Sequence, residues 1–241
     1  MTSDSPLQIS RWLLTALGTR MKVSYQDRIP TDCAVVVASN HRSVMDAPML
    51  MAAVRRPIRF ACHHYMGQVP VMRDIVNVLG AFPLEEQTHR LQSFFEQASR
   101  LLQSRQVVGV FPEGTPPMVS LTKPNTIGKF QRGFAHLALR GGVRDLAVLP
   151  VAIASTEETI NNSAVPLRVL SFFDPSEPLF DQPGWHPMVI YRRATVLIGR
   201  PCWITRSHRE QYQGKQAKTV VADLTNYCQQ EIGNLLRQGC Y

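Results

Sequence analysis

The stretch that decides the fold is Ala34–Asp46, which reads AVVVASNHRSVMD. Its first five residues, Ala34–Ala38, are an uncharged run of small and β-branched side chains, which predicts a buried strand. Ser39 and Asn40 end this run, and a helical pattern over Asp46–Val54 follows at once. A buried strand that leads through a short turn into a helix is typical of a domain built on a parallel sheet.

The same alternation of short apolar runs and helical segments continues along the chain. It predicts an α/β fold, a single domain with a central, mostly parallel sheet flanked by helices. Further strands are predicted at Ile58–Ala61, Ala81–Leu84, Val107–Phe111, Ala147–Ala154, Val169–Phe173 and Thr195–Ile198, and helices at Val71–Leu79, Thr88–Gln103, Lys129–Arg140 and Lys215–Arg237. The proline-rich segment Asn161–Met188 is predicted to be a surface excursion around one strand.

An amphipathic helix is predicted at residues 7–21, with an apolar face formed by Leu7, Leu13, Leu14, Leu17 and Met21. Trp12 beside Arg11 would suit a membrane interface, and a helix packed on the core fits the pattern equally well. We therefore divide the chain into an N-terminal helix at residues 1–22, which either associates with a membrane or packs on the core, and a domain at residues 23–241.

The composition is that of a globular protein with a basic surplus. The chain has 241 residues, 44% of them hydrophobic, and 26 Lys and Arg against 18 Asp and Glu give a net charge of +8. This composition excludes a disordered chain, and the charge suits either nucleic acid or an anionic membrane surface. The longest stretch without a charged residue, Phe60–Met72, is too short to span a bilayer, and no basic segment precedes the first apolar block as in a signal peptide.

A histidine and an aspartate follow the first buried strand at a spacing that suits catalysis. A carboxylate that fixes the tautomer of a histidine and stabilises its charged form makes that histidine a base at neutral pH. His41 in the turn and Asp46 in the first helical turn would meet in this way. Ser43-x-x-Asp46 also fits a helix capping box, which would explain these two residues without any chemistry.

A second polar turn, Phe111–Thr115, follows the strand predicted at Val107–Phe111. Glu113 would emerge at the end of a buried strand, where Gly114 and Thr115 supply a turn and a hydroxyl suited to a polar ligand group. A turn in which Pro112 and Gly114 do only conformational work is the alternative. Active sites of α/β domains lie at the carboxyl ends of strands, so the two turns together favour a site.

The chain resembles the glycerolipid acyltransferases, a family that includes the 1-acylglycerol-3-phosphate acyltransferases. NHRSVMD at residues 40–46 and FPEGT at residues 111–115 are similar to the Asn-His-x-Ser-x-x-Asp and Phe-Pro-Glu-Gly-Thr motifs of that family. Three further segments look like its remaining motifs in order and spacing, namely Ala81–Pro83, Phe130–Gly133 and Val148–Val151. The resemblance implies a glycerol-3-phosphate acyltransferase-like fold.

The resemblance further implies transfer of an acyl group from a thioester to a lysolipid hydroxyl, most simply that of 1-acyl-sn-glycerol-3-phosphate, in phospholipid biosynthesis. His41 would be the general base and Asp46 would orient it, with no cofactor and no metal. The donor would be acyl-CoA or acyl carrier protein. The implied substrate-binding residues are Asn40, Ser43, Glu113, Gly114, Thr115, Lys129 and Arg132. A cytoplasmic, peripheral membrane protein with a membrane surface as partner would fit this chemistry.

Two departures from the family pattern concern the acceptor. Relatives that accept a phosphate carry an arginine after the second and third motifs, where this chain has Leu84–Gln87 and Thr115–Pro117. An acidic pair repels a phosphate, so Lys129 and Arg132 are the remaining candidates, with Arg42 and Arg90 as more distant options. A lysolipid or glycolipid acceptor without phosphate is the alternative.

Four other functions remain to be compared with acyl transfer. A thioesterase would use the same His–Asp pair with water, and a non-catalytic peripheral lipid-binding protein would keep the fold alone. A metal site of His41, Asp46, His63, His64 and Glu113 matches no zinc spacing. Nucleic acid is not expected as a partner, because the arginines are not interleaved with aromatic residues.

Overall fold

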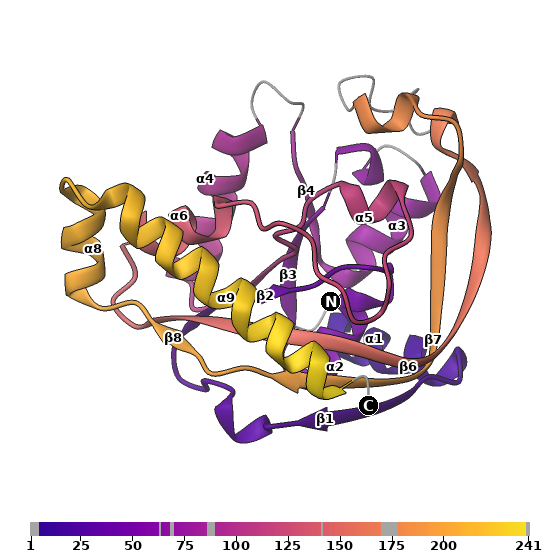
Figure 1. Ribbon diagram of the computed structural model, residues 1–241, viewed down its shortest axis with the longest axis horizontal. Coiled ribbons are helices and arrows are strands. Elements are labelled where there is room, and N and C mark those ends of the chain that lie inside the picture. The colour runs from indigo at the N-terminus through magenta and orange to yellow at the C-terminus, as the bar shows by residue number, and fades with distance from the viewer. Residues whose placement is uncertain are drawn as a thin grey trace.

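The centre of the molecule is a mostly parallel sheet with helices on both faces, as the sequence predicts (Figure 1). The computed structural model describes residues 5–62, 64–67, 70–85, 90–140, 142–169 and 178–239. Within these residues the strand order is β1-β7-β6-β2-β5-β3-β4, with β8 paired to β6. The strands are β1 Arg20–Ser24, β2 Ala34–Ser39, β3 Ile58–Cys62, β4 Phe82–Pro83, β5 Val107–Val110, β6 Leu146–Pro166, β7 Trp185–Ile198 and β8 Cys202–Trp203.

The helices divide between the two faces of the sheet and bury a core on each. They are α1 Ser5–Ala16, α2 Asp46–Val54, α3 Pro70–Leu79, α4 Arg90–Gln103, α5 Pro116–Val119, α6 Gly133–Arg140, α8 Arg206–Gln213 and α9 Ala217–Gly239, with short 3-10 helices η1 Gln26–Arg28, η2 His64–Gly67 and η3 Pro178–Asp181. Side chains of α1, α2 and α3 pack in one core and those of α4, α6 and α9 in the other. None of these described helices has both the length and the apolarity to cross a bilayer.

Strand β2 shows why the run Ala34–Ala38 has no polar alternation. Val35 and Val37 belong to the core under α2, while Ala34, Val36 and Ala38 belong to the opposite core. A strand covered on both faces needs apolar side chains at every position. Because β2 runs parallel to β5 and β6, the turns that follow β2 and β5 lie at the same edge of the sheet.

The N-terminal helix is shorter than predicted. It ends at Ala16, where Gly18 takes a left-handed φ of 67° and the N–H of Thr19 donates to the carbonyl of Leu14, as in a Schellman cap. Met21 therefore lies in strand β1, which pairs with β7, and not on the helix face. Leu14 is buried in the core, whereas Trp12 on the other side of α1 is 82% exposed.

The segment Asn161–Met188 is not the irregular excursion that its prolines suggest. Its described ends continue β6 to Pro166 and start β7 at Trp185, in an antiparallel ribbon that curves up one side of the molecule (Figure 1). We call residues 155–166 and 185–194 the β6–β7 arm. Among the described residues, the outer part of the arm pairs with no third strand, and such edges tolerate prolines that cannot donate a hydrogen bond. The predicted strand Val169–Phe173 falls largely outside the described residues, and Val169 itself lies in a helical turn.

Candidate active site

His41 and Asp46 meet at the carboxyl end of β2. The Nδ1 atom of His41 lies 2.8 Å from Oδ2 of Asp46, and the Asp46 side chain is almost completely buried. A carboxylate in this position accepts the Nδ1 hydrogen, which leaves the Nε2 lone pair of His41 free to accept a proton. The imidazole is partly exposed, so a substrate can reach it.

The buried carboxylate of Asp46 has three further hydrogen-bond donors. Its Oδ2 accepts the N–H groups of Arg42 at 2.7 Å and Ser43 at 2.9 Å, and its Oδ1 accepts the Tyr191 hydroxyl at 2.8 Å. Burial of a carboxylate without such partners would be costly. Burial, followed by the charge of Asp46, raises the pKa of Tyr191 well above its usual value, so Tyr191 stays a phenol that donates.

The capping-box alternative describes part of this geometry. The Asp46 carboxylate does accept the N–H of Ser43, which is one half of such a box. The hydroxyl of Ser43 instead donates to the carbonyl of Val189 at 2.6 Å and accepts the N–H of Met45 at 3.1 Å. Asp46 therefore stabilises the turn and holds His41 at the same time.

Glu113 connects the two turns at the sheet edge. Its Oε1 accepts the backbone N–H of His41 at 3.0 Å, and its Oε2 accepts that of Gly128 at 2.6 Å. Burial raises the pKa of Glu113, and these two hydrogen bonds oppose the shift. A Cβ at position 128 would lie 2.8 Å from Oε2, which accounts for the glycine. Glu113 thus supports the backbone of His41.

The predicted helix Lys129–Arg140 begins only at Gly133, because Glu113 and Pro112 hold the backbone before it in a loop. The N–H of Gln131 donates to the carbonyl of Pro112 at 2.7 Å, which ties the loop at 128–132 to the turn at 111–115. Lys129 and Arg132 are exposed in that loop. In the turn, Gly114 takes a φ of 73° and Thr115 precedes α5. The turn at 111–115 and the loop at 128–132, which carry these predicted residues, are therefore neighbours.

The ring of His41 is the end of a stack of three rings. It packs on Phe111 with centroids 4.1 Å apart and planes inclined by 15°, and Phe111 packs on Phe60 at 5.1 Å. Phe60 lies directly over Gly109, where a Cβ would approach the ring to 2.2 Å. This contact explains a glycine within the apolar strand β5 and fixes the plane of the imidazole.

Arg42 is buried and is not placed to bind a phosphate. Its guanidinium donates to both oxygens of Glu158, at 2.6 and 2.8 Å, and twice to the carbonyl of Thr122. Only 3% of the Arg42 side chain and 12% of the Glu158 side chain are exposed. Burial favours a raised pKa for Glu158, but the hydrogen bonds and charge of Arg42 outweigh it and lower that pKa. The option of Arg42 as a phosphate ligand was wrong.

Every polar side chain of the turn at residues 40–46, the proposed catalytic turn, is held by β6 or β7 or by Asp46. Asn40 makes two hydrogen bonds with the backbone of Ile153 at 2.8 and 3.0 Å, and Arg42 and Ser43 bind Glu158 and Val189. Asn40, Ser43 and Glu113 thus have structural partners, and their contact with a substrate stays a prediction. Tyr191 and Glu158 are the residues that the sequence alone did not reveal.

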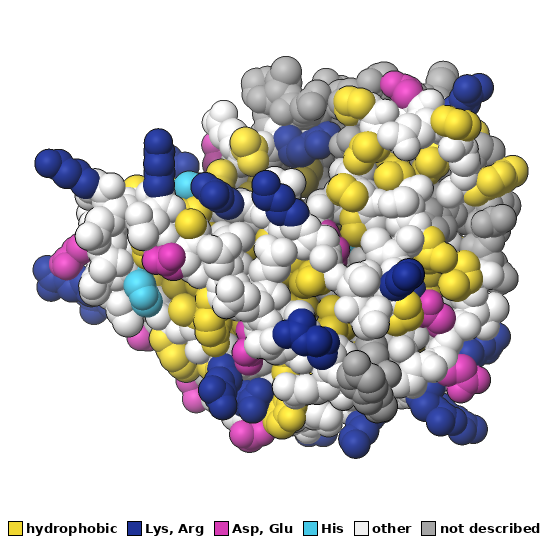
Figure 2. Space-filling model, in the orientation of Figure 1, with side chains coloured by type: hydrophobic (Ala, Val, Ile, Leu, Met, Phe, Trp, Pro, Cys, Tyr) yellow, Lys and Arg dark blue, Asp and Glu magenta, His cyan; other side chains and the backbone are white. Residues whose placement is uncertain are grey.

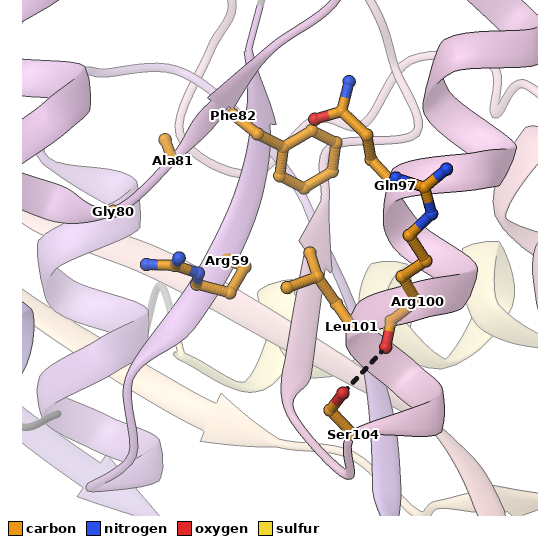
Figure 3. Close-up of a pocket in the computed structure, with 8 residues that line it drawn as sticks. All are labelled: Arg59, Gly80, Ala81, Phe82, Gln97, Arg100, Leu101 and Ser104. Atoms are coloured by element: carbon orange, nitrogen blue, oxygen red, sulfur yellow. Dashed lines mark hydrogen bonds between the residues drawn. The ribbon is translucent and has the colours of Figure 1, made fainter.

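A separate cavity of about 290 Å³ lies between β3, β4 and α4 (Figure 3). Figure 3 shows Arg59 beneath Gly80 and Arg100 beside Gln97, on either side of Phe82 and Leu101. Phe82 and Leu101 pack on the α4 side of the sheet, while the Phe60 that supports His41 packs on the α2 side. This cavity is therefore not the candidate site. Among the described residues, no group of three His, Cys, Asp or Glu side chains is arranged to hold a metal ion.

Residues 20–154 match the model of the Acyltransferase family, and the chain belongs to that family. The predicted membership of an acyltransferase family is thereby confirmed. The 1-acyl-sn-glycerol-3-phosphate acyltransferase of Borreliella burgdorferi is 24% identical over 176 residues, which are 73% of this chain and 66% of that enzyme, just under two thirds. The chain is also similar to the crystal structure of the 1-acyl-sn-glycerophosphate acyltransferase PlsC from Thermotoga maritima, with a TM-score of 0.62 and 17% identity. The superposition covers 97% of this chain and 77% of the PlsC chain.

The Arg42–Glu158 pair predicts a large loss of stability when one partner is removed. Arg42→Met leaves a buried carboxylate without its cation, and we expect a loss of about 3–5 kcal/mol in the free energy of unfolding, measured by urea denaturation. The matched control is Arg206→Met, which removes an exposed ion pair with Glu210 and should hardly change the midpoint. Equal, small effects in both variants would contradict the assignment.

The sign of the pH dependence follows from the lowered pKa of Glu158. The ion pair with Arg42 stabilises the folded protein at pH values above the pKa of a glutamate in the unfolded chain. This contribution is lost as the pH falls through the pKa that Glu158 has in the folded protein. Glu158→Gln should therefore lose less stability than the parent between neutral and acidic pH. Parallel stability curves for parent and variant would argue against the pairing.

Proposed function

We propose that this chain transfers a fatty acyl group from an acyl thioester to the hydroxyl of a lysolipid, with 1-acyl-sn-glycerol-3-phosphate as acceptor and phosphatidic acid as product. The observation that carries the proposal is the buried Asp46 carboxylate 2.8 Å from Nδ1 of a partly exposed His41. Family membership and the relatives' names support the reaction class. The donor is acyl-CoA or acyl carrier protein.

In the proposed mechanism the Nε2 atom of His41 takes the proton of the acceptor hydroxyl as its oxygen attacks the thioester carbonyl. Asp46 stabilises the imidazolium that forms. The tetrahedral intermediate then expels the thiolate, which takes the proton from Nε2 and leaves as the thiol, so that His41 returns to its starting state. No acyl-enzyme forms. General base catalysis contributes roughly 10²–10⁴-fold, and positioning of the two substrates supplies the rest.

The acceptor would lie beside the second turn. Gly114 and Thr115 belong to a turn that hydrogen bonds join to the loop carrying Lys129 and Arg132. The two cations are the available partners for an acceptor phosphate. Asn40, Ser43 and Glu113 keep the catalytic turn in place around the substrate.

A lipid acceptor implies that the enzyme works at a membrane surface, as a cytoplasmic peripheral protein. The chain carries a net charge of +8, which favours an anionic surface. The exposed side of α1, with Trp12 next to Arg11, offers one point of contact. The segment 1–22 is in this proposal a membrane-associating element that also packs on the core.

Removal of the base tests the mechanism. His41→Ala should lower acyl transfer from acyl-CoA to lysophosphatidic acid by at least about 10²-fold, since general base catalysis is lost. Product is measured as phosphatidic acid, and release of free fatty acid without acceptor is measured in parallel to detect a thioesterase. Vesicle binding should be unchanged. Full activity in this variant would overturn the mechanism, whereas vesicle binding without any transfer by the parent would favour a non-catalytic lipid-binding protein.

Tyr191→Phe tests whether Tyr191 positions the His–Asp pair. The variant removes one hydrogen bond from Oδ1 of Asp46 and nothing that touches the substrate, so kcat should fall about tenfold with KM unchanged. The pH-rate profile should also shift, which a purely structural loss would not cause. Tyr227→Phe, which removes a hydroxyl bound to the carbonyl of Arg200, is the control and should keep the parent kcat. A raised KM with parent kcat would contradict the assignment.

Charge removal beside the second turn tests the acceptor. Lys129→Met and Arg132→Met should each raise KM for lysophosphatidic acid about tenfold, the loss of one charge-assisted hydrogen bond, and leave KM for a phosphate-free lysolipid unchanged. Lys218→Met on α9 is the control with the same loss of charge. Equal or better turnover of a phosphate-free acceptor by the parent would replace lysophosphatidic acid as the proposed substrate.

A further inference from the structure

Exposed apolar side chains lie on the turn that carries His41 and on the segments connected to it. They come from the catalytic turn, the loop after α5, the β6–β7 arm and the helical turn that follows β6: Val44, Leu121, Ile160, Val169, Trp185 and Met188. We call these six residues the rim patch. In Figure 2, hydrophobic side chains gather over α5, η3 and the upper part of the arm. Exposed apolar residues scattered singly need no explanation, but a set around one site does.

Hydrogen bonds and strand pairing connect the rim patch to the turn that carries His41. Val44 follows Ser43, whose hydroxyl binds the carbonyl of Val189 on the arm. Leu121 precedes Thr122, whose carbonyl binds the buried guanidinium of Arg42. Along the arm, Ile160 is paired with Val189, and Trp185 closes the ribbon opposite Pro166. Helix α5 contacts both β7 and η3, which joins the loop side of the patch to the arm.

The charge around the rim patch suits an anionic surface. Lys123 lies two residues after Leu121, and Arg168 precedes Val169, and both are exposed. Glu158, the acidic residue of the arm nearest the turn, is neutralised by Arg42. An exposed tryptophan with neighbouring cations is a combination that favours the boundary between lipid headgroups and acyl chains.

We propose that the rim patch is the surface on which the protein docks to an anionic lipid bilayer, with Trp185 inserted into the interface. The inference rests on the proposed function, because it names the surface through which the lipid acceptor reaches His41. Docking here brings the mouth of the site to the lipid, whereas α1 packs on α2 and α3 against one face of the sheet. A membrane contact through Trp12 is compatible with docking through the rim patch and does not replace it.

The three tryptophans allow a direct test, because they lie on different parts of the surface. Trp185 is 51% exposed and Trp203 on β8 is 50% exposed, so Trp203 is a matched control away from the arm. Each single-tryptophan variant, made by Trp→Phe changes at the other two positions, is mixed with vesicles of phosphatidylcholine and phosphatidylglycerol with brominated acyl chains. Fluorescence quenching then reports which indole lies in the bilayer.

We expect quenching and a blue shift for Trp185 and neither for Trp203. Trp185→Ser with Val169→Ser should weaken vesicle binding at least tenfold and lower activity on vesicle-borne acceptor, with parent activity on a dispersed short-chain lysolipid. Quenching of Trp12 alone, or no vesicle binding at all, would overturn the proposal. Quenching is measured without substrates, and also in the His41→Ala background, so it does not depend on catalysis. Absence of acyl transfer would therefore count against the proposed function and not against the docking surface.

Discussion

The carboxylate of Asp46 is the group on which the rest of the site depends. A charge with almost no exposed surface persists only when its oxygens are fully hydrogen-bonded, and the protein supplies four partners from two parts of the chain, residues 41–43 and Tyr191. Two of them are backbone N–H groups of the turn itself, so the bonds that satisfy the charge also fix the turn. The fourth, from Tyr191, can form only if strand β7 runs past the end of β2. The geometry of His41 is thereby tied to the topology of the sheet.

This requirement gives the β6–β7 arm a role beyond covering the sheet edge. The arm provides Glu158 for Arg42, Val189 for Ser43 and Tyr191 for Asp46, and Ile153, which lies on β6 just before the arm, binds Asn40. On the other side, Glu113 holds the N–H of His41 and Phe111 holds its ring. The turn is therefore fixed from both neighbouring segments before any substrate is present. Such preorganisation is what a mechanism based on positioning needs.

The parts of this structure that depend on local pattern were predictable from the sequence. The buried strands β2 and β5, the helices α2 and α3, and the pair of His41 and Asp46 follow from apolar runs and short spacings. The unpredicted parts depend on distant pairings. Tyr191 reaches Asp46 across 145 residues and Glu158 reaches Arg42 across 116, and the prolines of the arm concealed the strands that bring them there. Strand β1 was not predicted, because Met21 also fits the helical pattern of α1. The helix ends at Ala16, before the left-handed Gly18, and Met21 lies in the strand.

The position of Arg42 limits which residues could bind a phosphate. A guanidinium enclosed by Glu158 and the Thr122 carbonyl is part of the fold, so the site cannot use it to replace the arginines that related motifs carry. Where the third motif would continue with a cation, Pro116 instead starts helix α5, which packs against the arm. Lys129 and Arg132 lie on a loop that Glu113 and Pro112 hold against the second turn through hydrogen bonds from its backbone. In the proposed reaction a phosphate would therefore be bound from the side of this loop, while His41 and Asp46 act on the acceptor hydroxyl.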